Sequence, residues 1–273
     1  MQAAILFWAR RLVAVCAFAT APALAQDTAP IPAPANPFPH TLADDASCPR
    51  VRMPALDVPI LRQAMRSNAE MIIVALGSSS TQGWHSSDIA HSYPAILQAE
   101  LQAALPSAHV AVINRGVGGQ DAAEMVPRLA ADALAIRPSL VIWQLGANGA
   151  MRRTDPEVFR DLVTAGVAAL QAGKVDLVLM DNQRAPRILA APDRALFDQA
   201  LSDAAARAGV GLFSRGTLMD QWQQAGHPYD QFISTDGIHH NDRGYRCMAK
   251  ALAGSILEGL GQPAAPIRSA SRR

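Results

Sequence analysis

The sequence has no excess of charge of either sign and few cysteines. Its 273 residues include 24 Lys and Arg against 23 Asp and Glu, a formal net charge of +1. No run of basic residues stands out, whereas nucleic-acid binding usually depends on one. The three cysteines and seven histidines form no cluster with the spacing of metal ligands. We therefore expect no nucleic-acid partner and no metal site.

The first 25 residues have the layout of a secretory signal peptide. Arg10 and Arg11 precede an apolar run at 12–19, and Ala23-x-Ala25 fits a small-residue cleavage site. The run is too short to cross a bilayer of about 30 Å, which needs about 20 apolar residues. We expect cleavage after Ala25, a periplasmic or secreted protein, and no stable membrane insertion after signal removal.

A globular body follows a short linker. Five prolines between positions 30 and 39 prevent regular helix or sheet, so 26–46 is predicted to be an extended linker. Half of all residues are hydrophobic and 17% are charged, which is typical of a folded domain. We assign this domain to 47–262 and a disordered basic tail to 263–273.

Signal removal would delete Cys16 and leave Cys48 and Cys247. In an oxidising compartment two such cysteines can form a disulfide. Two separate buried thiols fit the sequence equally well, so both alternatives stay open.

Apolar runs typical of buried strands alternate with helical patterns through the domain. This alternation indicates a parallel sheet with helices on both faces. The predicted fold class is α/β, a three-layer α/β/α sandwich with a central, mainly parallel five-stranded sheet. Strands are expected at 71–76, 109–113, 139–145, 175–180 and 210–213. Helices are expected at 57–69, 92–105, 121–136, 155–172, 192–208 and 242–260.

Polar segments follow the first four predicted strands. In open α/β sheets, ligands bind beyond the carboxyl ends of the strands. Because parallel strands end at one edge of the sheet, we expect these segments to form a single site. They are Gly77-Ser78-Ser79, Asn114-Arg115-Gly116, Gly146-Ala147-Asn148 and Asp181-Asn182-Gln183.

Ser79 stands at a predicted strand-to-helix junction, behind Gly77. A serine hydroxyl is a weak nucleophile until a base takes its proton and a third group orients that base. Because serine is also a favoured N-cap, a helix cap is the alternative interpretation of this turn.

Asp236 and His239 lie three residues apart, just before the last predicted helix. In a turn or first helical turn, side chains at this spacing can meet. The carboxylate would accept the imidazole Nδ1–H and leave Nε2 as the base. A helix N-terminal cap with an incidental histidine is the alternative.

Two glycine-containing segments can supply hydrogen-bond donors. Segment 114–120 has three glycines, and segment 146–149 places Asn148 between two glycines. Backbone N–H groups or a side-chain amide in such turns can hold a phosphate or an oxyanion. Neither segment completes a phosphate-binding or dinucleotide-binding pattern, and a plain turn remains the alternative for each.

Taken together and in order, these segments resemble the SGNH (GDSL-type) hydrolase family, from about residue 71 to 260. The resemblance implies a flavodoxin-like SGNH hydrolase fold with Ser79 as nucleophile and Asp236 and His239 as its partners. It also implies an oxyanion hole of Ser79, Gly119 and Asn148. The implied reaction is acyl transfer to serine, which requires no metal or organic cofactor.

The chain departs from the family pattern at two positions. Ser78 stands where the family usually has aspartate before the nucleophile, and Gly149 stands where aspartate follows Asn148. Neither aspartate belongs to the triad, so the chemistry is retained. Both belong to loops that shape the pocket, so the substrate is not defined by the motif.

Other polar and aromatic residues are weaker candidates. His85 and His91 follow the Ser79 turn and are candidates to line the pocket, whereas His240 is expected at its rim, pointing elsewhere. Trp84 and Trp143 are expected to pack rather than bind sugar, Trp143 because it lies inside a buried strand.

Residues 181–183 end the fourth predicted strand and are candidates to line the site. Arg184 and Arg187 follow them and would suit an anionic group, although a solvated loop is the favoured interpretation for both.

Three functions fit these residues. The first is an exported serine esterase acting on a small-molecule or glycan ester, and export motivates the glycan. The second is an O-acyltransferase on the same triad, which differs only in the acceptor. The third is a non-catalytic glycan- or partner-binding module on the same fold. The oligomeric state is left open.

Overall fold

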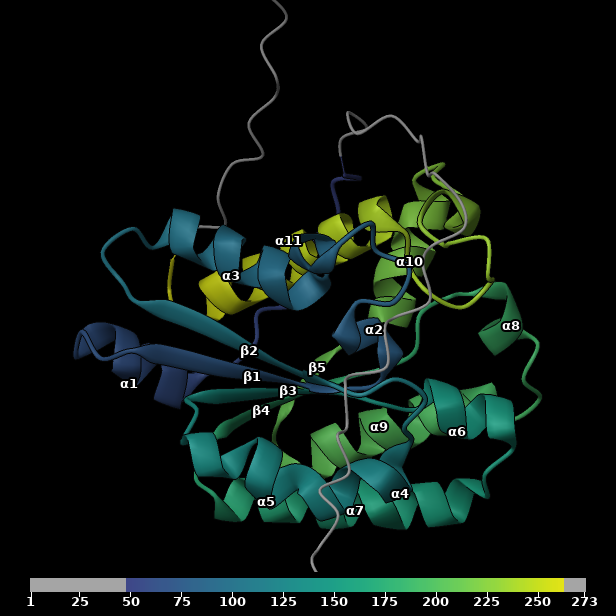
Figure 1. Ribbon diagram of the computed structural model, residues 1–273, viewed down its shortest axis with the longest axis horizontal. Helices are drawn as coiled ribbons and strands as arrows, with labels where there is room; N and C mark the ends of the chain where they lie inside the picture. Colours follow the sequence, from purple (N-terminus) through teal and green to yellow (C-terminus); the bar gives the residue numbers. More distant parts are fainter. Residues whose placement is uncertain (1–47, 263–273) are drawn as a thin grey trace, which may run out of the picture. The chain divides into compact units, whose positions relative to one another are not determined.

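The computed structural model of the protein describes residues 48–262, so the predicted signal peptide, linker and basic tail lie outside the described residues. A five-stranded, wholly parallel sheet in the order β2-β1-β3-β4-β5 forms the centre of this region (Figure 1). The strands are β1 (Met71–Gly77), β2 (Val110–Gly116), β3 (Leu140–Gln144), β4 (Asp176–Met180) and β5 (Gly211–Phe213). The predicted α/β class and parallel five-stranded sheet are confirmed.

Helices cover both faces of the sheet, so the structure has the three predicted layers. In Figure 1, α3, α10 and α11 lie on one side of the sheet, and α4, α5, α7 and α9 lie on the other. The helices are α1 (Pro59–Arg66), α2 (Ser79–Gln82), α3 (Tyr93–Ala104), α4 (Ala122–Met125), α5 (Leu129–Asp132), α6 (Ala147–Arg152), α7 (Pro156–Ala172), α8 (Pro186–Leu189), α9 (Arg194–Ala208), α10 (Arg215–Gln224) and α11 (Asp242–Gly259).

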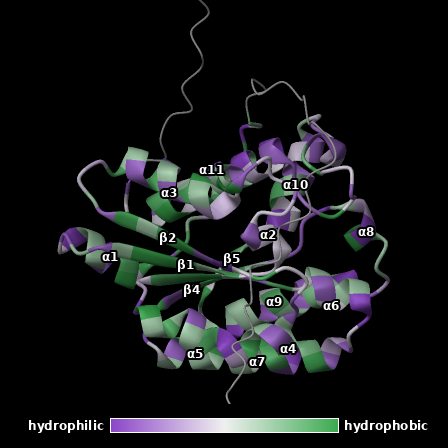
Figure 2. Cartoon of the chain, in the orientation of Figure 1, coloured by the Kyte–Doolittle hydropathy of each residue, from purple (hydrophilic) through white to green (hydrophobic). Residues whose placement is uncertain are grey.

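Each strand contributes to two separate hydrophobic cores because successive side chains point to opposite faces. Ile73 and Ala75 belong to the core beneath α3 and α11, whereas Val74 and Leu76 belong to the core beneath α7 and α9. All four are fully buried. Figure 2 shows β1 and β2 as mostly hydrophobic, while the helices carry hydrophilic residues as well. Burial on both faces explains why the strands read as continuous apolar runs.

The predicted helix at 121–136 is wrong as a single helix. The segment instead forms α4, a 3₁₀ turn at Val126–Arg128, α5 and a second 3₁₀ turn at Leu134–Ile136. Pro127 lies in the first of these turns, and proline has no N–H to continue a helical ladder. The start of α2 agrees with the predicted strand-to-helix junction at Ser79. Helices α6, α8 and α10 were not predicted, and α6 and α8 hold too few residues to show a periodic pattern.

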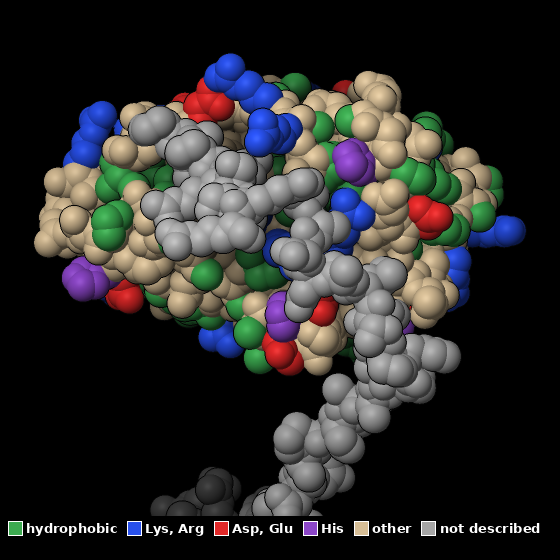
Figure 3. All heavy atoms as spheres, turned by 90° about the horizontal axis from the view of Figure 1, so that it is seen from above, with side chains coloured by type: hydrophobic (Ala, Val, Ile, Leu, Met, Phe, Trp, Pro, Cys, Tyr) green, Lys and Arg blue, Asp and Glu red, His purple; other side chains and the backbone are tan. Residues whose placement is uncertain are grey.

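A disulfide joins Cys48 to Cys247 and so connects the start of the described region to α11. This resolves the alternative that the sequence left open. Among residues 48–262, no helix has the length and apolar character needed to span a bilayer. Basic side chains are scattered over the described part of the surface in Figure 3 and form no single patch on that face.

Candidate active site

Ser79 lies at the first position of α2, directly beyond the end of β1. Ser78 has extended backbone angles and turns the chain from strand to helix. The end of β2 approaches this turn so closely that a Cβ atom on Gly116 would lie 2.1 Å from the backbone nitrogen of Gln82. Glycine at 116 therefore allows the first two strand ends and α2 to pack together.

The buried side chain of Gln144, at the end of β3, fixes the turn that carries Ser79. Its Oε1 accepts three hydrogen bonds, from Ser78 N at 3.0 Å, Ser78 Oγ at 3.1 Å and Thr81 Oγ1 at 3.0 Å. Gln144 is only 1% exposed, so these bonds are shielded from water. The sequence showed a polar residue ending an apolar strand, but not that its oxygen serves the neighbouring turn.

Asp236 and His239 lie in a closed loop before α11. The loop is pinned by an antiparallel bridge between Ile233 and His240 and by a hydrogen bond from Ser234 N to the His239 carbonyl at 2.8 Å. Asn241 caps α11 by accepting from a backbone N–H in its first turn. These contacts hold the His239 side chain toward the end of β1.

The structure brings Ser79, His239 and Asp236 together in one hydrogen-bonded series. Ser79 Oγ lies 2.7 Å from His239 Nε2, and His239 Nδ1 lies 2.5 Å from Asp236 Oδ2. Ser79 is 8% exposed and His239 is 6% exposed, so both lie just below the surface. The Asp-x-x-His spacing thus produces the contact that the sequence predicted.

Asp236 is held as an anion by its hydrogen bonds. Partial burial raises its pKa, but the bonds from the His239 ring and from two backbone N–H groups outweigh this effect and lower the pKa to about 2. The backbone donors are Ile238 N and His239 N, each 3.0 Å from Oδ1. At neutral pH the carboxylate can therefore orient the imidazole through a charge-assisted hydrogen bond.

The loop after β2, which contains Gly119, is hydrogen-bonded to α6, which contains Asn148. Asn148 Nδ2 donates to the Gln120 carbonyl at 2.8 Å, and Arg152 Nη2 donates to the Gly119 carbonyl at 2.7 Å. Gly119 has φ +82°, a left-handed conformation that favours glycine. Both contacts connect α6, beyond β3, to the loop that follows β2.

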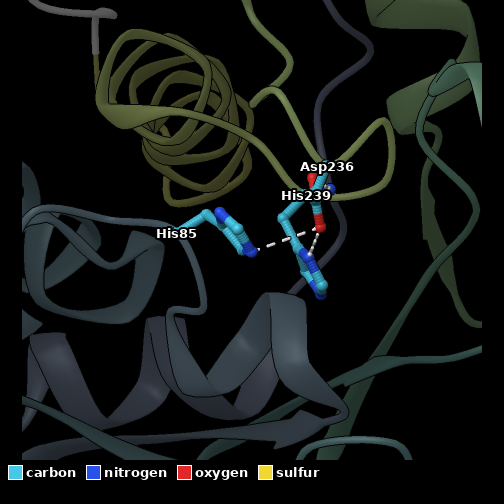
Figure 4. Close-up of side chains that lie close together, drawn as sticks. All are labelled: His85, Asp236 and His239. Atoms are coloured by element: carbon cyan, nitrogen blue, oxygen red, sulfur yellow. Dashed lines mark hydrogen bonds and ion pairs between the residues drawn. The ribbon is translucent and has the colours of Figure 1, made fainter. Parts of the chain in front are cut away.

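Two aromatic residues from the segment after α2 lie beside the triad. The His85 ring stacks on His239, with centroids 5.2 Å apart and an interplanar angle of 10°. Its Nε2 lies 3.4 Å from Asp236 Oδ2, as Figure 4 shows. Trp84 lies 5.9 Å from the His239 ring and is 42% exposed, so it does not fill the core. Trp143 is fully buried, as predicted.

Two of the weaker candidates lie in places that the sequence did not predict. His240 is fully buried, not at the rim, because the bridge to Ile233 turns its ring inward against Tyr245. Burial lowers the pKa of His240 to about 3, so the ring is neutral. Arg184 is neither an anion site nor part of a solvated loop, because Asp220 and Asp198 pair with it.

The remaining candidates flank the site. Gln183 is fully buried, and its Nε2 donates to the Ile238 carbonyl at 2.8 Å, which supports the loop beneath His239. Arg187 is exposed as expected, but it lies in α8 rather than in a loop. His91 pairs with Asp88 at 3.1 Å, away from the series that contains His239.

His85, Asp236 and His239 also form a group with one possible ligand atom each, all within 4.8 Å of one another. Two imidazoles and a carboxylate are ligands that zinc accepts. In this structure, however, His239 is hydrogen-bonded to Asp236 through Nδ1 and to Ser79 through Nε2. These hydrogen bonds therefore already engage two of the three possible metal ligands.

The model of the Non-GDSL lipase-like family matches residues 47–262. The chain belongs to this family. The family's description agrees with Ser78, which stands where GDSL-type sequences have aspartate. Among curated proteins, no sequence matches the chain significantly.

Solved structures of esterases share the fold. A two-domain esterase active on acetylated mannans has a TM-score of 0.65 at 22% identity, covering 80% of this chain and 57% of that one. An acetylxylan esterase from Geobacillus stearothermophilus has 0.60 at 16%, covering 72% and 97%. A lipase/acylhydrolase from Enterococcus faecalis has 0.60 at 20%, covering 69% and 95%.

The chain thus spans little more than half the length of the mannan esterase. The chain therefore belongs to a lipase-like family and shares its fold with solved esterases and lipases.

Proposed function

We propose that the protein is a serine esterase in which Ser79 is the nucleophile, His239 the general base and Asp236 the group that orients it. The observation that carries the proposal is the pair of contacts at 2.7 Å and 2.5 Å that joins the three side chains. The order nucleophile, base and orienting carboxylate is the one that activates a serine hydroxyl.

In the first half of the reaction, Ser79 Oγ attacks the ester carbonyl carbon while His239 Nε2 takes its proton. The tetrahedral intermediate then collapses, and the protonated imidazole delivers that proton to the leaving alcohol oxygen. In the second half, the same imidazole takes a proton from water, which attacks the acyl carbonyl carbon. The bond between that carbon and Ser79 Oγ then breaks, the imidazolium returns its proton to Ser79 Oγ, and the acid leaves. Asp236 stays ionised throughout and stabilises the imidazolium, in agreement with its low pKa.

We assign the oxyanion hole to Ser79 N–H, Gly119 N–H and the Asn148 amide. Only one hydrogen of the Asn148 amide is used by the Gln120 carbonyl, so the second remains for an oxyanion. Loss of one such donor typically lowers the rate by about 10²–10³-fold. Asn148→Ala is expected to lower kcat by this amount.

Export is also part of the proposal. The disulfide between Cys48 and Cys247 is supporting evidence, because disulfides persist in oxidising compartments. The signal-like layout of the first 25 residues points to the same compartment. The protein would act in the periplasm or outside the cell.

The proposed substrate is an acetylated glycan, and Trp84 is the supporting feature. Its exposed indole lies beside His239, and its Nε1 donates to Gln82 Oε1 at 3.0 Å, which fixes the ring orientation. Gly118 packs against the same ring, since a Cβ there would lie 3.2 Å from it. A flat, fixed aromatic surface beside the base suits a sugar ring. Two structural neighbours act on acetylated mannans and acetylxylan.

The deciding experiment compares the mature protein with Ser79→Ala on 4-nitrophenyl acetate. A nucleophile of this type is expected to contribute roughly 10⁴-fold or more to kcat. Ser80→Ala is the matched control, because Ser80 is the next serine along the chain, and it should retain its rate within a few-fold. Equal nitrophenol release by wild type and Ser79→Ala would refute the proposal.

The glycan assignment has its own test. Trp84→Ala is expected to raise KM for acetylated xylan or mannan oligosaccharides by about tenfold, or ~1.4 kcal/mol. Its kinetics on 4-nitrophenyl acetate, which offers no sugar ring, should change much less. Equal changes on both substrates would argue against a sugar-binding role for Trp84.

A further inference from the structure

We propose that His85 is a positioning residue of the triad that shares the carboxylate of Asp236 with His239. This inference rests on the proposed function of Ser79, His239 and Asp236. The inference is based on the position of a second imidazole. The His85 ring, which comes from a separate segment, faces both His239 and Asp236 (Figure 4).

The two imidazole rings are nearly parallel, at 10°, with centroids 5.2 Å apart. His239 is thus held on one face by a neighbouring ring and at Nδ1 by Asp236. The stack limits rotation of the His239 ring about its side-chain bonds. Rotation would carry Nε2 away from Ser79 Oγ, so the stack preserves the 2.7 Å contact on which proton transfer depends.

Both ring nitrogens of His85 have neighbours in the loop that carries Asp236. Its Nδ1 lies 3.0 Å from Ser234 Oγ, and its Nε2 faces Asp236 Oδ2 at 3.4 Å. Ser234 belongs to the same closed loop as Asp236. One face and both nitrogens of the ring therefore meet the loop that carries the base.

The backbone around His85 is held in an unusual shape. His85 has φ +64°, a left-handed conformation that side-chain-bearing residues rarely adopt. The flanking residues are fastened to α11, since Tyr245 Oη donates to the Trp84 carbonyl and Ser87 N donates to Asp242 Oδ1, both at 2.8 Å. Such strain persists where surrounding contacts fix it, and it is typical of functional segments.

Asp236 and His239 are among the groups that lie against His85: Asp236 Oδ2 is 3.4 Å from its Nε2, and the His239 ring stacks on its face. Asp242 of α11 accepts from Ser87 N on the segment that carries His85. Without the His85 ring, His239 keeps Asp236 at Nδ1 but loses the neighbouring ring on its face. Its Nε2 is then held less firmly toward Ser79 Oγ, so proton transfer slows.

Two variants separate the contact of the His85 ring with His239 from its contact with Asp236. His85→Phe keeps a flat ring over His239 but has no nitrogen to face Asp236. His85→Asn removes the ring and tolerates the left-handed backbone well. Both are compared with wild type and Ser79→Ala on 4-nitrophenyl acetate across pH 5–9, with melting temperatures as a folding control.

We expect kcat of His85→Asn to fall about tenfold at pH 8 with KM changed less than about twofold, because orientation is lost rather than binding. His85→Phe should keep kcat within about threefold at pH 8. A merely structural residue would not give this pattern, in which kcat falls in His85→Asn at nearly constant KM and melting temperature and is retained in His85→Phe.

The inference is overturned if His85→Asn keeps the wild-type kcat, or if its kcat and melting temperature fall together. If His85→Asn does not fold, the kcat of His85→Phe at pH 8 decides, and a fall of more than about threefold overturns the inference. Ser79→Ala distinguishes a failure of the proposed esterase function from a failure of the proposed role of His85. An active Ser79→Ala protein refutes the proposed function, whereas an inactive one with unchanged His85 variants refutes only the role of His85.

Discussion

Replacing Gln144 with methionine tests how the turn that carries Ser79 is held. Methionine is similar in length and apolar, so it removes the acceptor without opening a large cavity. Ser78 N and Ser78 Oγ then lose their partner inside the protein. Thr81 Oγ1 also loses its bond to Gln144, but it retains Tyr93 Oη at 3.3 Å.

A buried donor left without a partner costs about 1–3 kcal/mol, so the two Ser78 donors together cost about 4 kcal/mol. This is a large share of a typical folding free energy of about 5–15 kcal/mol. For a domain of this size it corresponds to a fall in melting temperature of about 10 °C. Because Ser79 follows Ser78 directly, the hydroxyl also loses its fixed position, and kcat should fall.

The assay combines thermal unfolding with the 4-nitrophenyl acetate rate. Gln144→Glu is the control, because it retains an acceptor oxygen for the same three donors. The amide nitrogen that it replaces has no hydrogen-bond partner among the described residues. The glutamate variant should therefore lose less stability than the methionine variant. A Gln144→Met protein within about 2 °C of wild type, with unchanged kcat, would refute the reasoning.

Further predictions concern the disulfide, acid stability and metal. Reduction, or Cys247→Ser, opens a loop with a sequence separation of 199. The chain-entropy model gives a loss of about 5 kcal/mol for such a loop. Urea unfolding with and without reductant measures this loss, and an unchanged midpoint would contradict it. Asp236 has a folded pKa of about 2 against 3.8 ordinarily, so its stabilisation is present above about pH 4 and is lost as the pH falls toward 2. An Asp236→Asn protein should lack this part of the acid transition, as titration monitored by circular dichroism would reveal. Dialysis against EDTA should leave esterase activity unchanged, and a loss that Zn²⁺ restores would refute the metal-free mechanism.

The order of strands and helices follows from hydrophobic pattern alone. Runs such as 71–76 and 175–180 are apolar at every position or nearly so, because both faces of the sheet are covered. The candidate residues at strand ends also follow, since parallel strands must end at one edge. Short helices such as α6 and α8 do not follow, because four to six residues do not define a period.

The α/β architecture could be predicted from the sequence because hydrophobic runs are local in the chain, and the spacing of Asp236 and His239 indicated that they can meet. The position of Ser79 after a strand indicated this residue as well. Which side chains surround these residues follows only from the packing of the layers. Gln144 lies 66 positions from Ser78, and Ser234 lies 149 positions from His85. Contacts over such separations depend on how the layers pack, and no local pattern encodes that packing.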